Sequence, residues 1–169
     1  LGAELCPSCP SGWIQKNNGS FLCMPCNAGK YGDNCTLCSK GQYRNSDDAA
    51  DTCILCAKGK YQNQKGQALC LPCVPGYFNN KHGRATCTAC PINTFANETE
   101  LKYCFDCPVG ESAEEVGSPS CLKCGAGKYG DNCTWCSKGQ YRNSDDAADT
   151  CILCAKGKYQ NQKGQALCL

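Results

Sequence analysis

Residues 28–71 read AGKYGDNCTLCSKGQYRNSDDAADTCILCAKGKYQNQKGQALCL, and residues 126–169 repeat this stretch at an offset of 98 residues. The 44 positions differ only once, where Leu37 in the first copy becomes Trp135 in the second. The rest of the chain divides around this duplication. The duplication predicts three parts: the end of a preceding cysteine-rich unit at 1–22, a complete 98-residue repeat at 23–120, and the start of a near-identical repeat at 121–169.

A shorter period, Cys-x-x-Cys, runs through the whole chain and divides it into modules. Successive modules start 17, 12, 18, 17, 17, 17, 17, 12 and 18 residues apart, so the long repeat contains six of them. Periods of this size indicate a repeat architecture in which each module contacts mainly its neighbours. Modules one to ten start at Cys6, Cys23, Cys35, Cys53, Cys70, Cys87, Cys104, Cys121, Cys133 and Cys151, and Cys168 opens an eleventh.

The composition favours a disulfide scaffold. The 169 residues include 21 Cys but only 4 Phe, 2 Trp and 1 Met, too few large apolar residues for a conventional core. Such a chain requires an oxidising compartment. The net charge of +2 favours neither a nucleic-acid partner nor an acidic one, and no apolar run is long enough to span a bilayer. Because Leu1 carries neither an initiator Met nor a signal-peptide pattern, we interpret the chain as a piece of a longer secreted protein.

Most modules follow the pattern Cys-x-x-Cys-x-x-Gly-x-aromatic, with a second glycine four residues before the next module in several cases. Modules one and seven have Ile14 and Ser112 at the aromatic position. Module six has Asn93 at the first glycine position, which predicts a left-handed backbone there, because Asn is the residue that best tolerates positive φ after Gly. We expect a short strand carrying the aromatic residue, a turn, and a return strand. The first glycines are Gly29, Gly41, Gly59, Gly76, Gly127, Gly139 and Gly157, and the second ones Gly19, Gly66, Gly83, Gly117 and Gly164.

The predicted fold class is a small disulfide-rich repeat: an elongated rod of short β-hairpins stapled by disulfides, with little helix and a minimal hydrophobic core. No segment places apolar residues at helical spacing. One exception is Ser46–Asp51, Ser-Asp-Asp-Ala-Ala-Asp, which can form a single helical turn capped by Ser or Asp.

Cys-x-x-Cys pairs can bind zinc as well as form disulfides. Two pairs with a 13-residue gap fit a zinc ribbon. Ten consecutive pairs without an assisting His favour disulfides, and a thioredoxin-like redox site requires a βαβ context that the pattern lacks. No metal or cofactor is expected.

The Cys-x-x-Cys-x-x-Gly-x-Tyr pattern resembles the extracellular cysteine-rich repeats grouped as ephrin-receptor-like or growth-factor-receptor-like. It is also similar to TNF-receptor modules and to the cysteine-repeat surface antigens of protists such as ciliates and Giardia. The resemblance covers nearly the whole chain and implies an elongated, secreted, non-catalytic array of modules. The near-identity of two stretches departs from the varied binding loops of receptors.

Two disulfide connectivities remain open from the sequence. In the sequential pairing each bond closes one hairpin, and the short loop Cys26–Cys35 looks like the last disulfide loop of an EGF or laminin-type EGF module. The nested alternative, Cys6–Cys23 with Cys9–Cys26, occurs in part of the TNF-receptor modules. The sequential pairing leaves Cys6 without a partner in this chain, and the nested pairing leaves Cys168 without one. The favoured bonds are Cys9–Cys23, Cys26–Cys35, Cys38–Cys53, Cys56–Cys70, Cys73–Cys87, Cys90–Cys104, Cys107–Cys121, Cys124–Cys133, Cys136–Cys151 and Cys154–Cys168.

Four sequons predict N-glycosylation, and they agree with secretion. Asn34 and Asn132 have Cys in the middle of the sequon, where glycosylation competes with disulfide formation, so Asn18 and Asn97 are favoured. The acidic loops have oxygen ligands that could bind Ca²⁺, but EF-hand spacing is absent and a solvated loop is the preferred interpretation. These loops contain Asp47, Asp48 and Asp51, repeated as Asp145, Asp146 and Asp149.

The leading functional hypothesis is an extracellular structural protein: a repeat segment of a fibre, appendage, stalk or surface coat that assembles with copies of itself. Identical surfaces at a fixed offset favour open-ended association. The alternative is a receptor or adhesion ectodomain that binds a protein or glycan, with Trp13 and Trp135 as anchors unless each covers a disulfide in its own module. No enzyme is expected, because the single histidine, His82, precedes a turn glycine and no catalytic grouping accompanies it.

Overall fold

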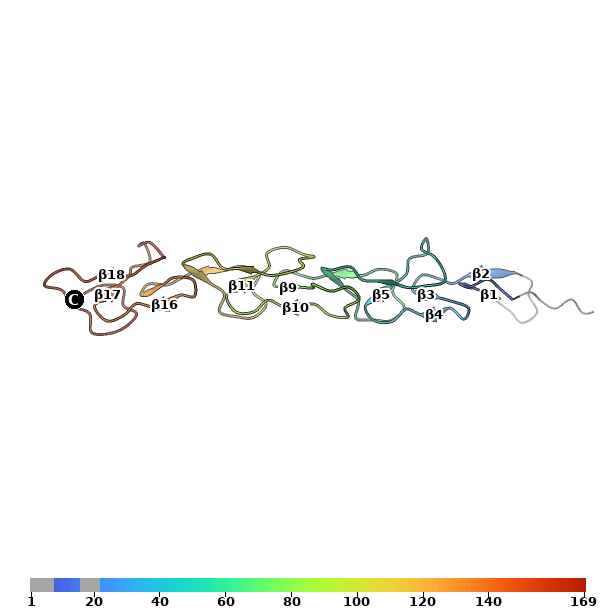
Figure 1. Ribbon diagram of the computed structural model, residues 1–169, viewed down its shortest axis with the longest axis horizontal. Helices are drawn as coiled ribbons and strands as arrows, with labels where there is room; N and C mark the ends of the chain where they lie inside the picture. The colour runs from blue at the N-terminus through green and yellow to red at the C-terminus, as the bar shows by residue number, and fades with distance from the viewer. Residues whose placement is uncertain (1–7, 16–21) are drawn as a thin grey trace, which may run out of the picture. The chain divides into compact units, whose positions relative to one another are not determined.

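The chain folds as a series of two-stranded antiparallel hairpins joined by turns (Figure 1). The computed structural model describes residues 8–15 and 22–169, and these residues contain no helix. The prediction of short disulfide-stapled hairpins with little helix is confirmed. Cys6, Asn18 and Gly19 lie outside the described residues.

The strands are two or three residues long. The first eight are β1 (Trp13–Gln15), β2 (Cys23–Pro25), β3 (Lys30–Tyr31), β4 (Thr36–Leu37), β5 (Gln42–Tyr43), β6 (Ile54–Leu55), β7 (Lys60–Tyr61) and β8 (Leu71–Pro72). The others are β9 (Tyr77–Phe78), β10 (Thr88–Ala89), β11 (Thr94–Phe95), β12 (Phe105–Asp106), β13 (Glu111–Ser112), β14 (Leu122–Lys123), β15 (Lys128–Tyr129), β16 (Thr134–Trp135), β17 (Gln140–Tyr141) and β18 (Ile152–Leu153).

The hairpins place the aromatic residue of one strand opposite the residue that follows the next module's first cysteine. Tyr43 faces Ile54, and Phe95 faces Phe105. The turn before the first strand needs a left-handed residue, and Asn93 adopts φ +64° where Gly29 has +77°. The prediction for Asn93 is therefore confirmed.

By packing, the chain divides into two compact units. The first contains the described residues up to Cys73 together with 79–88 and 100–102, and the second contains 74–78, 89–99 and 103–169. This division does not coincide with the 98-residue repeat, which is a feature of the sequence.

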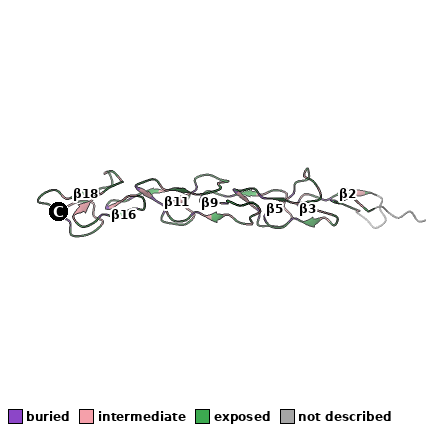
Figure 2. Cartoon of the chain, in the orientation of Figure 1, coloured by how far each residue is buried: buried purple, intermediate pink, exposed green. Residues whose placement is uncertain are grey.

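The interior of the hairpins consists mainly of sulfur and backbone. The second cysteine of most pairs is buried, and Cys38, Cys56, Cys73, Cys90 and Cys136 are fully so. Most strand residues are half-buried or exposed (Figure 2), and large apolar side chains such as Leu55 and Leu122 face solvent. Covalent bonds and backbone hydrogen bonds must therefore supply the stability that a hydrophobic core provides elsewhere.

The acidic segment Ser46–Asp51 forms turns, so the expected helical turn is absent. The Asp48 N–H donates to the Asn45 carbonyl over 3.3 Å, and the Asn45 N–H donates to Asp48 Oδ2 over 2.8 Å. Side chains of this type compete with the helix by bonding their own backbone.

Candidate functional site

The ten disulfides of the structure follow the sequential pairing. Cys154 is bonded to Cys168, which the nested pairing would leave alone. In the chain-entropy model, each loop of about 15 residues stabilises by roughly 3 kcal/mol. The bonds are Cys9–Cys23, Cys26–Cys35, Cys38–Cys53, Cys56–Cys70, Cys73–Cys87, Cys90–Cys104, Cys107–Cys121, Cys124–Cys133, Cys136–Cys151 and Cys154–Cys168.

Consecutive modules are also joined by backbone hydrogen bonds. The backbone N–H of the first glycine in one module donates to a backbone carbonyl in the next module. The accepting residue lies three positions after the first glycine of that next module. Gly29 donates to Arg44 over 2.7 Å, and Gly41 donates to Gln62 over 2.7 Å. We call this acceptor the linking position. It is buried in most modules, where its occupants are Arg44, Gln62, Asn79, Ala96, Ala113, Arg142 and Gln160.

Packing also reaches the second neighbour along the chain. A Cβ built on Gly29 of module two would lie 2.0 Å from the carbonyl oxygen of Gly66 in module four, and Gly41 meets Gly83 in the same way. The first glycine is therefore required both by its positive φ and by this close approach. We expected each module to contact mainly the adjacent modules, and the structure adds this contact between modules two apart.

Arg44 fills its linking position with a buried guanidinium that is only 1% exposed. Its hydrogen bonds all go to backbone carbonyls, and the shortest is 2.7 Å, from Nη1 to Lys30. Net hydrogen bonds to a charged group stabilise by about 1.5–3 kcal/mol each. The acceptors are the carbonyls of Cys26, Asn27, Lys30, Asp48 and Ala49.

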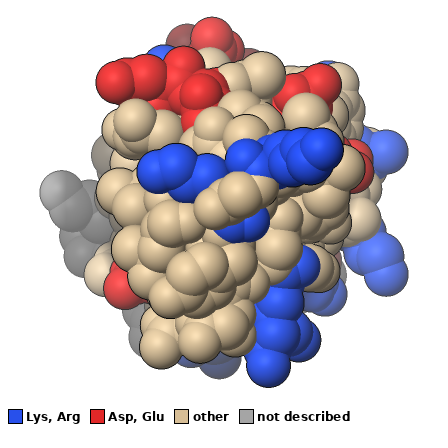
Figure 3. All heavy atoms as spheres, turned by 90° about the vertical axis from the view of Figure 1, so that its left-hand side faces the viewer, with Lys and Arg blue, Asp and Glu red and all other residues tan. Residues whose placement is uncertain are grey.

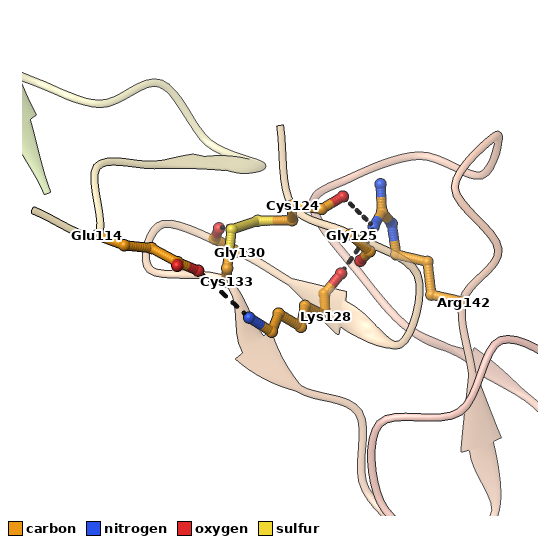
Figure 4. A network of polar contacts seen from close by, with 7 residues as sticks. All are labelled: Glu114, Cys124, Gly125, Lys128, Gly130, Cys133 and Arg142. Atoms are coloured by element: carbon orange, nitrogen blue, oxygen red, sulfur yellow. Dashed lines mark hydrogen bonds and ion pairs between the residues drawn. A yellow bond between two sulfur atoms is a disulfide. The ribbon is translucent and has the colours of Figure 1, made fainter. Parts of the chain in front are cut away.

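The second copy repeats this network at Arg142, which is 2% exposed (Figure 4). Its five distances agree with those of Arg44 to within 0.2 Å. Beside the network, Lys128 Nζ lies 3.4 Å from Glu114 and 4.7 Å from the centre of the Trp135 ring. The Arg142 acceptors are the carbonyls of Cys124, Gly125, Lys128, Asp146 and Ala147.

The Leu/Trp exchange between the copies lies at an exposed surface in both. Leu37 is 49% exposed and Trp135 is 56% exposed. Each side chain lies against the second glycine of a following module, Leu37 on Gly66 and Trp135 on Gly164. The ring of Trp135 thus covers the backbone of a glycine in the next module.

The predicted glycosylation sites Asn34, Asn97 and Asn132 are all exposed, and so is His82. The acidic loops do not converge on a cation site. Across residues 8–15 and 22–169, no group of three or more His, Cys, Asp or Glu side chains could hold a metal ion. No helix in this part of the chain is long and apolar enough to cross a membrane.

Charge is distributed unevenly. In the end view of Figure 3, most Asp and Glu side chains lie along the upper edge and most Lys and Arg side chains lie below them, although some of the two kinds are adjacent. The uneven distribution also appears along the sequence: residues 52–97 carry five basic side chains and no acidic one.

These features define a class of protein: a disulfide-stapled repeat in which, within the described residues, each of modules two to nine is joined to the next by a backbone hydrogen bond. Residues 46–83, 64–100 and 76–124 match the family model described as tyrosine-protein kinase ephrin type A/B receptor-like. The chain therefore contains cysteine-rich repeats of the ephrin-receptor-like type over residues 46–124. The disulfides and this repeat type together indicate an extracellular, receptor-type domain. No curated protein matches the chain.

Proposed function

We propose that the chain is a structural repeat segment of a secreted fibre, appendage, stalk or surface coat, and that its partners are copies of itself. The observation that carries the proposal is the equivalence of the two copies. Arg44 and Arg142 donate to carbonyls at equivalent positions over distances that agree to within 0.2 Å. Gln62 and Gln160 donate to the Leu69 and Leu167 carbonyls over 2.8 and 2.9 Å. These side chains are buried, so the equivalence concerns the frame of each copy. Because the same contacts fix the same backbone, the two copies carry the same exposed residues at a fixed offset, apart from Leu37 and Trp135, and these can serve as equivalent attachment points along one chain.

The linkage between modules suits a load-bearing spacer. A disulfide closes each hairpin, and hydrogen bonds at the linking position tie it to its neighbours, so a local opening breaks several bonds at once. In arrays of this kind, stability is a sum of module terms and interface terms. The proposal includes glycans on exposed sequons and no catalytic activity.

Electron microscopy of the native material tests this proposal. We expect filaments or an ordered coat. Isolated particles the size of a single chain would contradict it.

A receptor or adhesion ectodomain is the second candidate, favoured by the ephrin-receptor-like match and by an exposed aromatic cluster in modules that are not duplicated. Tyr103 is 59% exposed and Phe105 is 40% exposed. Such side chains serve as anchors for a protein or glycan ligand. The full-length sequence separates the candidates: further 98-residue copies favour the fibre, whereas a membrane span followed by a kinase or death domain favours the receptor.

A further inference from the structure

The turn at the start of each acidic loop holds an asparagine side chain against the backbone nitrogen of the next residue. The Ser46 N–H donates to Asn45 Oδ1 over 2.7 Å, and the Ser46 hydroxyl donates to the same oxygen over 3.2 Å. The second copy has both contacts between Ser144 and Asn143, again at 2.7 and 3.2 Å. Within residues 8–15 and 22–169, no other asparagine oxygen accepts from the nitrogen that follows it.

Contacts on both sides of the asparagine fix this turn. The Asn45 N–H donates to Asp48 Oδ2 over 2.8 Å, and the Asp48 carbonyl accepts from the buried Arg44 over 3.4 Å. Arg44 Nε also donates to the Ala49 carbonyl over 2.9 Å. Because the backbone is held before and after Asn45, the contact between its side chain and Ser46 belongs to a preorganised turn.

This geometry places a backbone nitrogen beside the carbon of a side-chain amide. A carbonyl bond is about 1.23 Å long, so a nitrogen 2.7 Å from Asn45 Oδ1 lies within about 4 Å of Asn45 Cγ. Holding two reacting atoms close together removes much of the entropic cost of their reaction. Asn45 and Ser46 are both exposed, so water and hydroxide reach them, and the small serine side chain leaves its backbone nitrogen open to attack.

We propose that Asn45 and Asn143 are sites of spontaneous deamidation through a cyclic imide. Hydroxide removes the Ser46 N–H proton, the nitrogen forms a bond to Asn45 Cγ, and the side-chain nitrogen takes a proton from water and leaves as ammonia. The Ser46 hydroxyl donates to Oδ1 while that oxygen carries the negative charge of the tetrahedral intermediate. Water then opens the imide at either carbonyl, which gives aspartate or isoaspartate. The reaction consumes one water and needs neither an oxidant nor a partner, so the inference does not rest on the proposed fibre.

The products change the region that the turn supports. Isoaspartate adds one methylene to the backbone between Arg44 and the Asp48 and Ala49 carbonyls to which it donates. Either product adds a negative charge to a loop that already has three aspartates. The same turn packs on module one, since a Cβ built on Gly12 would lie 2.1 Å from that of Ala50. Deamidation therefore loosens both the buried arginine network and this contact between modules.

The test is incubation of the disulfide-bonded chain at physiological temperature and mildly alkaline pH, followed by reduction and peptide mass spectrometry. Cleavage before aspartate gives residues 33–46 and 131–144, in which Leu37 and Trp135 distinguish the copies. Isoaspartate at position 45 leaves the first peptide uncut but heavier, whereas aspartate creates a new cleavage site. Asn63 and Asn161 are the matched controls, because they are exposed, duplicated and without the contact to the following nitrogen.

We expect Asn45 and Asn143 to react at similar rates, roughly tenfold or more faster than Asn63 and Asn161. The rates should rise in proportion to hydroxide concentration. The reduced and alkylated chain keeps the sequence but loses the turn, so its rate at Asn45 should be roughly threefold or more lower. Rates in the folded chain that do not exceed those of the controls, or those of the unfolded chain, would overturn the proposal.

The variant Ser46→Ala tests the hydroxyl, because it keeps the backbone nitrogen and a small side chain. Deamidation at Asn45 should slow by about two- to tenfold, the factor that one hydrogen bond supplies. Asn143 in the same molecule should keep its rate and serves as the internal control. An unchanged rate at Asn45, or an equal loss at Asn143, would overturn the role assigned to the hydroxyl.

Discussion

Module three and module six differ in the group that donates a hydrogen bond to the preceding module. In module six the linking position is Ala96, and the nearby Cys73 carbonyl accepts from the backbone N–H of Glu100, at the second-glycine position. Module three has no second glycine. There the corresponding carbonyl, that of Cys26, accepts from Arg44 Nη1 over 3.2 Å.

The buried arginine therefore replaces a backbone donor that its module lacks. Module nine shows the same exchange, with Arg142 donating to the Cys124 carbonyl over 3.3 Å. A side chain with five donors can take over several carbonyls at once, which explains why a charged residue is tolerated in the interior. The comparison predicts that identical substitutions will have unequal effects in the two types of module.

The largest effect is expected for Arg44→Ala. This variant places in module three the residue that module six has naturally, but it leaves several buried carbonyls without a donor, so it should cost about 3–5 kcal/mol locally. Hydrogen exchange at the Gly29 amide measures the loss, and the equivalent Gly127 amide beside the unchanged Arg142 is the internal control. Gln62→Ala, which removes two neutral hydrogen bonds, should cost only about 1–2 kcal/mol. Equal effects would contradict the replacement account.

The second-neighbour contact predicts a difference between two glycines that share a left-handed conformation. Gly29→Ala forces its Cβ onto the Gly66 carbonyl and should cost about 3 kcal/mol, whereas Gly32→Ala meets no atom within 4 Å and should cost only about 1 kcal/mol of backbone strain. Thermal unfolding of the two variants gives the comparison. Similar melting temperatures would show that the contact is unimportant.

Module six can be made more like its neighbours by Glu100→Gly. Glu100 adopts φ +63°, a conformation that costs a non-glycine residue about 1–2 kcal/mol. Losing its exposed ion pair with Lys60 costs less than about 1 kcal/mol. The variant should gain about 0.5–1 kcal/mol in chemical denaturation, and Lys60→Ala should lose less than that; a destabilised Glu100→Gly would contradict this balance.

The smallest effect is expected for Trp135→Leu, which makes the two copies identical over all 44 positions. Because the side chain is more than half exposed, stability should change by less than about 0.5 kcal/mol. The melting temperature should match that of the reciprocal variant Leu37→Trp. A large loss in only one of them would show that the copies have different surroundings.

The module period and the cysteine spacing were enough to predict the hairpins, the near-absence of helix and the left-handed Asn93, since each follows from local chain chemistry. The buried arginine was not predicted, because Arg44 looks like an ordinary surface residue until the missing second glycine is noticed. That signal is present in the sequence: both buried arginines occur in modules with the Asn-Ser-Asp-Asp-Ala-Ala-Asp turn.

Contacts between modules two apart could not be predicted from spacing alone, since they depend on how successive hairpins alternate in space. The contact of Trp135 with Gly164 joins adjacent modules, and it too depends on how successive hairpins are placed in space. The helical turn that Ser46–Asp51 could have formed is absent, because Asp and Asn side chains bond the backbone there in turns instead of capping a helix.

The most direct test of the structural role is a structure of the native assembly, with its interchain contacts assigned to both copies of the duplicated stretch. The fibre account predicts that residues 28–71 and 126–169 meet equivalent neighbours at the 98-residue offset, with Leu37 and Trp135 in similar environments. Unrelated surroundings for the two copies, or a chain that stays monomeric at high concentration, would contradict it and favour the receptor interpretation.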